Sequence, residues 1–532
     1  FKIELVASEP TIINPVCIAH DEQGRLYVAE SHTYRYGPKG TPLKDAAPNP
    51  IVRLDPLPDG KGYRRVLVAE GFEDPVMGMA IRGNQLWATA CNFLYRFDID
   101  DSKLGAAAAS GGAANTPIGV NRQTIAIDKN KAWNPFGMFV LEWGPEGDLY
   151  MSVGNHNIDI YRVADEKQRI SSRGGSGIVM RMKPDGSRME RLVQGLRVPY
   201  GFDYDPFGQL WLLSNGEGNP NRFVRVIEGV DYHCYSRTPG DAEWLSGRHP
   251  LAPPCFELPA GACTQLLRYY AANFPRDYQG SLLLDNWGRH GFNGGNRTIF
   301  RYVPDERNAI QTKEEFISCT DPHFRCSHVL YDRDGGLLLA DWYGRDDESD
   351  LTGRIWRVSY TGDDRPVVTH RLDAPEWKDP AKSRAFAVAG LGSADHLVRA
   401  KATAVLVGLG NESVGALAAH ASTAAEPLGA ANALWALVRI GTPESLAAVA
   451  GGTKHGDWRV RRLGIDLLRR YAVENAEAVA KQLAGDADPA VRVAAARALQ
   501  SPADRRAAIV AALKAGAAAD PHLRYEAASI LA

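Results

Sequence analysis

The sequence predicts a six-bladed β-propeller followed by an α-helical, HEAT-like solenoid. A Gly-x-Leu strand pattern recurs six times in the first two thirds of the chain, and an alanine-rich helical pattern recurs about every 31 residues in the last third. At 532 residues the chain is also long enough to bury at least two cores. We therefore expect a propeller over residues 1–369 and a solenoid over residues 370–532, the class of a multidomain β plus α protein.

The first repeat has an apolar strand that opens with Gly-x-Leu, or with Asn-Gln-Leu in one copy. Each copy follows another apolar strand and a turn rich in Asp, Pro or Gly, and a third strand comes after it, which is typical of hairpins. About four antiparallel strands repeated six times predict propeller blades, because no single blade can bury both of its faces. The repeated leucines are Leu26, Leu86, Leu149, Leu210, Leu282 and Leu337.

Two units of this repeat depart from the pattern. The fifth lacks the turn after its first strand, which lies around "TQLLRYY". The sixth has no outer strand of its own after "RIWRVSY". We expect residues 1–8 to supply that strand and so to close the ring.

The second repeat consists of helices with an apolar stripe, each preceded by an acidic residue. This residue is the expected N-cap of its helix. The spacing predicts short HEAT-like helix pairs that stack into a solenoid. The chain stops inside a repeat without a polar cap, so we expect it to be part of a longer protein. The expected N-caps are Asp395, Glu426, Asp457, Asp488 and Asp520.

Charge and hydropathy exclude two classes of partner. The formal net charge of −2 gives no indication of the basic surface that binds nucleic acids. No apolar run approaches the roughly 20 residues that a membrane-spanning helix requires. The chain begins at Phe1 on a strand-like segment, which suggests that a leader has been removed.

The seven cysteines contain no CxxC or CxxCH motif, so neither a zinc knuckle nor a covalent haem is expected within this chain. Cys255 with Cys263, and Cys319 with Cys326, could each close a short loop in an oxidising compartment. Buried free thiols are an equal alternative. The odd count leaves at least one cysteine unpaired.

Candidate catalytic and anion-binding residues lie where the loops of one rim converge. His32 and His156 follow the second strands of their blades, and either could act in catalysis or bond loop backbone. Arg197 and Arg325 stand where inner strands begin, so each guanidinium could bind an anion or pair with a neighbouring carboxylate.

The same rim has candidates for sugar and metal binding. Trp287 and Trp342 could stack on sugar rings, while Asp285 and Asp341 act on the sugar as carboxylates. The acidic run from Asp346 to Asp350 could hold Ca²⁺, or it could be a solvated loop that pairs with neighbouring arginines. Signals for a P-loop, GxGxxG, HExxH and Ser-His-Asp are absent.

Several segments resemble the propeller of an exported bacterial family of membrane-bound dehydrogenases, which is related to soluble quinoprotein glucose and sorbosone dehydrogenases. The resemblance covers nearly the whole chain, because that propeller is often followed by HEAT-like repeats and then by a c-type haem domain with a CxxCH motif. Such a haem domain would lie beyond Ala532. The segments are "FKIELVASEP", "DEQGRLYVAESHTY", "LEWGPEGDLYMSVGNH", "GLRVPYGFDYDPFGQLW" and "LLLADWYGRDDESDLTGRIWRV".

The resemblance implies pyrroloquinoline quinone held by arginines, together with Ca²⁺, over the propeller. It puts Arg197 and Arg325 at cofactor positions, and we place Tyr200 and Arg289 beside them. The calcium loop corresponds roughly to Gly216 and Glu217, and the acidic run adds Asp346 and Asp347 as candidate ligands.

Three positions depart from the family pattern. Val198 stands where the quinoproteins have asparagine, and Ser327 stands where they have a second arginine. Phe136 replaces their catalytic histidine, and phenylalanine cannot accept a proton from a hydroxyl group. A quinoprotein reaction would therefore need another rim base, for which the candidates are His32, His156 and His290.

The expected function is a periplasmic or otherwise extracytoplasmic oxidoreductase. It would oxidise a sugar or related alcohol and pass electrons to a c-type cytochrome domain or protein. Two alternatives stay open: a non-redox carbohydrate enzyme or binding module, and a scaffold whose solenoid docks partner proteins.

Overall fold

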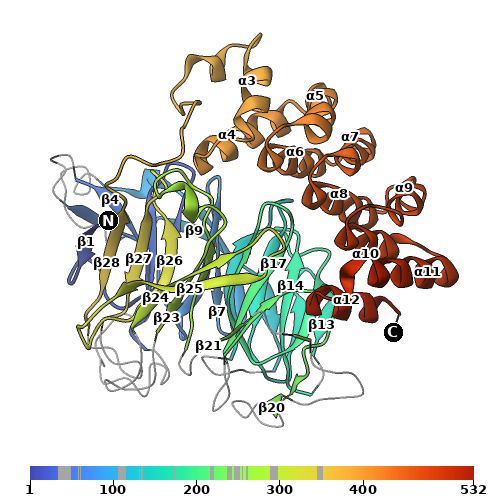
Figure 1. Cartoon of the computed structure of the whole chain (residues 1–532). Helices are drawn as coiled ribbons and strands as arrows, with labels where there is room; N and C mark the ends of the chain where they lie inside the picture. The colour runs from blue at the N-terminus through green and yellow to red at the C-terminus, as the bar shows by residue number, and fades with distance from the viewer. Residues whose placement is uncertain are drawn as a thin grey trace.

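The computed structural model describes most of the chain (Figure 1). Strands occupy the first part of the chain, from Lys2 to Ser359, and helices the second, up to Leu531. The description leaves out residues 34–48, 58, 60–61, 106–115, 131, 133–135, 173, 216–220, 236–242, 245–251, 254–255, 259–261, 288–296, 344–350 and 532.

The strands form six blades, as the repeat predicts, and each Gly-x-Leu strand is the second strand of its blade. All pairings within the blades are antiparallel. Blades 1 to 3 contain β2 (Pro15–His20), β3 (Leu26–Glu30), β4 (Ile51–Pro56) and β5 (Tyr63–Ala69); β6 (Val76–Arg82), β7 (Gln85–Ala90), β8 (Phe93–Ile99) and β9 (Gly119–Asp128); and β10 (Met138–Trp143), β11 (Leu149–Val153), β14 (Gly177–Met182) and β15 (Glu190–Leu196). Blades 4 to 6 contain β16 (Val198–Tyr204), β17 (Leu210–Asn215), β18 (Asn221–Arg225) and β21 (Phe256–Leu258); β22 (Leu266–Arg268), β23 (Leu282–Asn286), β24 (Thr298–Pro304) and β25 (Ile310–Ser318); and β26 (Cys326–Tyr331), β27 (Leu337–Asp341) and β28 (Arg354–Ser359) with β1 (Lys2–Ser8).

The first strand of the chain closes the ring. β1 pairs with β28 as the outer strand of blade 6, with Leu5 opposite Trp356. Phe1 precedes this strand and packs its ring against Phe274, with centroids 5.1 Å apart. The expectation for residues 1–8 is confirmed.

Two features of the blades refine the prediction. The hairpin of β12 (Asp159–Arg162) and β13 (Asp165–Ser171) adds to the outer edge of blade 2, which therefore has six strands. The first strand of blade 5, β22, has only three residues. The segment that joins it to β23 contains the 3₁₀ turn Arg276–Tyr278 instead of a tight hairpin.

The propeller core lies between adjacent blades, where the apolar faces of neighbouring sheets meet. Trp87 of blade 2 packs edge-on against Trp143 of blade 3, with centroids 5.0 Å apart. Trp211 of blade 4 lies in one buried cluster with Leu282 and Tyr302 of blade 5. Each blade is thus stabilised by its two neighbours.

The helices stack as a solenoid along one end of the propeller (Figure 1). Four of the five predicted N-caps are confirmed, because Asp395, Asp457, Asp488 and Asp520 accept backbone N–H groups of the first helical turn. Glu426 makes no such bond, and Pro427, which has no N–H, begins that helix. The helices are α3 (Ser383–Gly390), α4 (His396–Gly408), α5 (Asn411–Thr423), α6 (Pro427–Ile440), α7 (Pro443–Ala448), α8 (Trp458–Arg470), α9 (Ala476–Leu483), α10 (Pro489–Ala498), α11 (Pro502–Ala512) and α12 (Pro521–Leu531).

The described cysteines are free thiols. Cys319 is exposed and Cys326 is buried, so the short loop between them is not bridged. Cys263 is also free, and its possible partner Cys255 lies outside the described residues. The described part of the chain therefore agrees with the second interpretation of the cysteines, that of free thiols.

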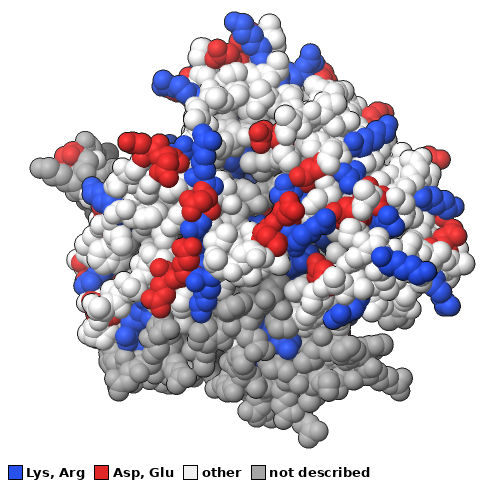
Figure 2. All heavy atoms as spheres, viewed as in Figure 1, with Lys and Arg blue, Asp and Glu red and all other residues white. Residues whose placement is uncertain are grey.

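The solenoid contacts the turns that join the first and second strands of the blades. Trp435 of α6 donates its indole N–H to the carbonyl of Pro206 at 2.8 Å. Arg470 of α8 lies 3.4 Å from the Glu146 carboxylate. Figure 2 shows acidic and basic side chains interleaved along the seam between the two parts. One end of the propeller is therefore covered, and the opposite end carries the candidate site.

Candidate functional site at the propeller rim

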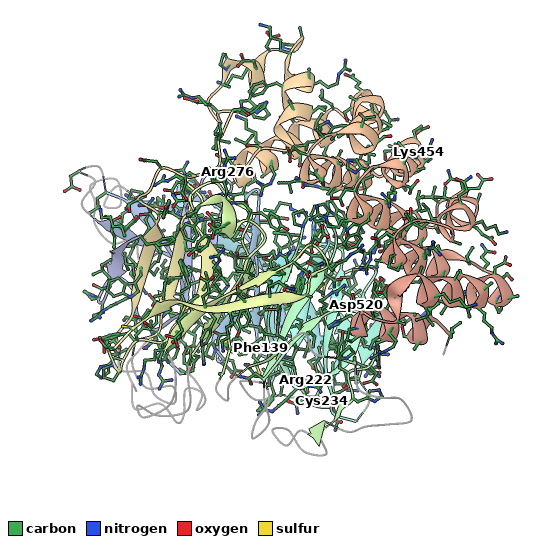
Figure 3. The ribbon with its side chains drawn as sticks, viewed as in Figure 1. Phe139, Arg222, Cys234, Arg276, Lys454 and Asp520 are labelled. Atoms are coloured by element: carbon green, nitrogen blue, oxygen red, sulfur yellow. The ribbon has the colours of Figure 1, made fainter. Side chains whose placement is uncertain are left out.

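The inner strands begin and the second strands end at the same end of the ring, because the two are antiparallel. Cys326 of β26 pairs with Asp341 of β27, for example. We call this the site end, and the end that contacts the helices the solenoid end. Figure 3 shows Arg222 and Cys234 at the site end, away from the helices.

Aromatic side chains fill the middle of the site end. They belong to one packed apolar cluster, which we call the aromatic floor, formed by Phe136, Phe139, Tyr200, Trp287 and Trp342. The Phe139 and Tyr200 rings are 4.9 Å apart, and the Trp287 and Trp342 rings are 5.5 Å apart. The floor gives a ligand apolar ring faces rather than charged groups.

Two buried arginines lie against this floor, as predicted from their positions at the starts of inner strands. The guanidinium of Arg197 lies 5.7 Å from the Phe136 ring centroid, and that of Arg325 lies 5.8 Å from the Trp287 centroid. Arg197 is 8% exposed and Arg325 is 1% exposed. Arg325 also donates to the Trp287 carbonyl at 3.2 Å. Blades 4 and 6 thus bring two cations to one aromatic cluster.

The carboxylates predicted to act on a sugar instead bind backbone. Asp285 accepts the N–H groups of Thr264 and Gln265 at 2.8 and 2.7 Å. Asp341 accepts the N–H groups of Arg325 and Tyr343 at 2.8 and 3.1 Å, and both carboxylates are at most 1% exposed. Burial raises the pKa of each to about 6, despite these donors. Both carboxylates therefore hold the starts of the inner strands in place.

Trp342 is likewise only 1% exposed and forms part of the floor, whereas Trp287 is partly accessible. Of the two predicted stacking rings, Trp287 is therefore the one that a ligand can reach.

Replacing Asp341 with Asn should change how stability depends on pH. The folded-state pKa of about 6 lies above the ordinary 3.8, so the contribution of this carboxyl to stability is fully present below pH 4 and is lost as the pH rises through 6. Relative to the neutral D341N variant, the loss should be roughly 3 kcal/mol, since a shift of about two pKa units is worth about 1.4 kcal/mol per unit. Urea unfolding of both proteins between pH 4 and 7.5 measures it. Parallel pH profiles would contradict the assignment.

The two predicted histidines that the structure describes are held by protein groups. His32 lies 3.1 Å from the Glu30 carboxylate, which is also paired with Arg65. His156 has its Nδ1 3.0 Å from the Gly154 carbonyl and its Nε2 2.7 Å from Asp128. Both ring nitrogens of His156 therefore face protein oxygens, which leaves neither available to accept a proton from a substrate.

Asn155, between Gly154 and His156, has a side chain without a hydrogen-bond partner among the described residues. It is 0% exposed, and neither its amide oxygen nor its amide nitrogen is bonded within that part of the chain. The preceding Gly154 lies against the backbone of Phe136, and a Cβ there would be 2.8 Å from the Phe136 Cα. The unsatisfied side-chain amide of Asn155 is therefore adjacent to Gly154, which packs against Phe136, the position where the related quinoproteins have their base.

Several predicted residues lie outside the described residues. They are His290, Arg289, Gly216, Glu217, Asp346 and Asp347. Within the described ranges, no group of three or more His, Cys, Asp or Glu side chains could hold a metal ion. No described helix is long and apolar enough to cross a bilayer.

Several blades use the polar residue at or just after the end of the second strand in the same way, which the repeat pattern alone did not predict. Asn92 bonds both backbone groups of Ala132, and Asn215 bonds both backbone groups of Cys263, each over 2.8–3.2 Å. The recurrence of Asn, Asp or Glu at one place in the repeat was the available signal. It indicates a structural requirement of the fold rather than a catalytic one.

The fold and the site define a six-bladed propeller with an aromatic, arginine-flanked centre, joined to a helical solenoid. A family model described as a domain of unknown function (DUF7133) matches residues 1–250. No curated protein matches the chain significantly.

Three solved structures are similar to the chain. An oxidoreductase described as a glucose dehydrogenase from Thermus thermophilus has 18% identity and a TM-score of 0.45, over 67% of this chain and 99% of that one. The aldose sugar dehydrogenase of Streptomyces coelicolor in its PQQ-bound form has 17% identity and a TM-score of 0.43, over 67% of this chain and 98% of that one. The pyranose dehydrogenase PQQ domain of Coprinopsis cinerea has 13% identity and a TM-score of 0.41, over 67% of this chain and 95% of that one. Because the TM-scores are all below 0.5, the assignment of six blades rests on the strand pairing described above.

Proposed function

We propose that the site end binds an anionic quinone of the pyrroloquinoline quinone type, and that the chain is an oxidoreductase for a sugar or related alcohol. The observation that carries the proposal is the pair of buried guanidiniums, Arg197 and Arg325, against one aromatic floor. A planar polycarboxylate needs such a combination, because guanidiniums bind carboxylates and ring faces stack on a flat ligand. A quinone, when bound, supplies the capacity to accept two electrons from an alcohol.

The residues present fit such a ligand in part. Arg197 and Arg325 would pair with its carboxylates, and Trp287 and Tyr200 would border its ring. Burial favours this pairing, since an ion pair is stronger where water is excluded. Neither Phe136 nor His156 can supply the proton acceptor, because Phe136 is a buried hydrocarbon ring and His156 is held at both nitrogens.

The wider proposal includes Ca²⁺ at the site end, a c-type haem protein as electron acceptor, and a location outside the cytoplasm. Its support is the resemblance of the rim segments and of the domain order to exported quinoprotein-like dehydrogenases. The candidate calcium ligands remain Gly216, Glu217, Asp346 and Asp347.

A second candidate function is carbohydrate binding without redox chemistry. The specific observation in its favour is Phe136, which is 3% exposed and stands where the related quinoproteins have their base. The partly accessible ring of Trp287 could stack on a sugar. This function needs no proton acceptor.

Replacing Arg325 or Arg197 with Gln is expected to weaken quinone binding by about 10- to 100-fold, since a hydrogen bond to a charged group contributes roughly 1.5–3 kcal/mol. Binding is measured by quenching of tryptophan fluorescence and by the quinone absorption spectrum, with Ca²⁺ present. Arg276→Gln is the matched control, because Arg276 is an exposed arginine far from the site end (Figure 3).

The outcome separates the two candidate functions. No quinone binding by the wild type, or equal binding by all three variants, contradicts the first. Binding of sugars without dye reduction, unchanged by added quinone, supports the second.

A further inference from the structure

A carboxylate of one inner strand is bonded across the central channel of the ring. Glu142 belongs to β10, the inner strand of blade 3, and Gln265 directly precedes β22, the inner strand of blade 5. Blade 4 separates these two strands in the ring. The Gln265 side chain nevertheless donates from Nε2 to the Glu142 carboxylate at 3.2 Å, so this bond crosses the channel.

The charge of Glu142 also reaches blade 1. The pKa of the Cys17 thiol in β2 is raised to about 12. Burial is the main cause of this rise, and the charge of Glu142 contributes to it. Together with the hydrogen bond from blade 5, this interaction indicates that the carboxylate lies near the axis.

A second carboxylate lies on the inner strand of the blade between and acts electrostatically on Glu142. Asp203 is on β16, the inner strand of blade 4, and accepts the backbone N–H of Arg268 at 2.6 Å. Burial and the charge of Asp203 together hold the pKa of Glu142 well above its usual range. Both residues have intermediate exposure, so water reaches them.

Within the described part of the chain, this pair of acids has no cation bonded to it. No ion pair among the described residues includes Glu142 or Asp203. Arg268 is the cation that acts on Asp203, but its guanidinium lies 5.0 Å from the Trp211 ring and donates to Asn308 at 3.2 Å. Two acidic groups that interact with each other therefore have no positive partner bonded to them among these residues.

The amide of Gln265 provides an independent sign of a missing ligand. Its nitrogen Nε2 donates a hydrogen bond to Glu142, while its oxygen Oε1 is buried and accepts no hydrogen bond from the described residues. Gln265 is 4% exposed. A buried carbonyl oxygen on the side chain that bonds Glu142 thus lacks a partner that is a hydrogen-bond donor or a cation.

We infer that the central channel binds a divalent cation of the Ca²⁺ type between Glu142, Asp203 and the side-chain oxygen of Gln265. Two carboxylates balance the charge of the ion, and waters in the adjoining space complete its 6–8 oxygen ligands. An all-oxygen set favours Ca²⁺ over Zn²⁺, and Cys17 stays a neutral thiol. The bound ion would tie the inner strands of blades 3, 4 and 5 together.

The test is a Ca²⁺ titration of the chelator-treated protein by calorimetry, with thermal unfolding in parallel and no quinone added. We expect a dissociation constant of about 10⁻⁴–10⁻³ M, the range of extracellular sites with few charged ligands, and a Tm that rises with Ca²⁺. Glu142→Gln and Asp203→Asn should each weaken binding at least tenfold. Gln265→Leu, which removes no charge, should weaken it less.

Two controls make the result specific. The double variant D346N/D347N should retain this binding, which distinguishes the channel from a calcium site at the rim. Magnesium chloride at matched ionic strength should raise Tm less than Ca²⁺, because Mg²⁺ requires a stricter octahedral geometry.

Several results would overturn the inference. They are the absence of Ca²⁺ binding by the wild type, full binding by E142Q, and a Tm that responds to pH but not to Ca²⁺. The last would mean that the two carboxyl groups share a proton instead of a cation. Wild-type calorimetry alone decides the case if a variant fails to fold. Failure of the quinone proposal leaves all of these measurements unaffected.

Discussion

Replacing Phe136 with histidine is expected to raise the rate of sugar oxidation by the quinone-reconstituted protein by about 10²- to 10³-fold, which is the contribution typical of a positioned general base. The side chain at position 136 is 3% exposed on the aromatic floor, 5.7 Å from the Arg197 guanidinium. Burial and this cation would both favour a neutral imidazole, which is the form that accepts a proton. Dye reduction with a panel of aldoses, with and without quinone, measures the gain.

The unsatisfied amide of Asn155 strengthens this expectation. It belongs to the segment that packs against the Phe136 backbone, and its oxygen has no donor among the described residues. An imidazole N–H at position 136 would be a donor for it, which would orient the other ring nitrogen toward the ligand. Asn155→Leu in the F136H background should therefore remove part of the gain.

The matched control is Phe139→His, because Phe139 is an equally buried ring of the same blade and floor. It should give no gain. Phe136→Leu tests whether the loss of the ring alone alters activity. If F136H binds the quinone and the sugar but oxidises at the wild-type rate, position 136 does not face the reacting hydroxyl group, and the carbohydrate-binding function is favoured.

The architecture could be predicted because both repeats depend on local patterns. A turn followed by Gly-x-Leu and an apolar strand identifies a blade wherever it occurs, and six copies leave few alternatives to a ring. The first strand could be assigned to blade 6 because that blade alone lacked a fourth strand. The acidic N-caps worked for the same reason, since Asp457 and Asp488 act within their own first turn.

The roles of the rim residues could not be predicted in the same way. Position in the repeat placed Asp285 and Asp341 at the correct end of the ring, but not the direction of their carboxylates. Both turn to the backbone at the starts of the inner strands, where the N–H groups of Gln265 and Arg325 would otherwise be unsatisfied. Such a demand arises only when the chain is folded.

The channel acids were missed because their partners are distant in sequence. Glu142 and Gln265 are 123 positions apart and meet only across the axis. A signal was nevertheless present: "FVLEW" and "FDYD" each place a carboxylate inside an otherwise apolar inner strand. In a closed propeller, such a residue lies between two blades or in the channel, so it requires a partner.

Replacing Arg470 with Ala is expected to destabilise the protein by about 3–5 kcal/mol, the usual effect of removing one partner from a buried ion pair. Arg470 ends α8 and lies 3.4 Å from Glu146 and 3.7 Å from Glu228, both of which belong to the propeller. The side chain of Glu146 is 0% exposed. Without Arg470, its charge stays buried at the seam with Arg181 as a more distant partner, at 3.8 Å.

The electrostatics of Glu228 indicate how strongly the two parts are coupled. Burial alone would raise its pKa, yet Arg470, Arg181 and Arg469 lower it to about 2. Two of these three arginines come from the solenoid. The stabilisation is therefore present above the ordinary pKa of 4.5 and is lost as the pH falls toward 2.

Differential scanning calorimetry at pH 7 tests this coupling. The wild type should unfold in one main transition, whereas in R470A the solenoid should unfold at a lower temperature than the propeller. Arg506→Ala, at an exposed arginine of α11, is the control and should cost less than about 0.5 kcal/mol. The double variant R470M/E146Q, which leaves no unpaired charge at this contact, should be more stable than R470A. If R470A and R506A unfold alike, the ion pairs at the seam do not couple the solenoid to the propeller, and the apolar contacts around Trp435 must do so instead.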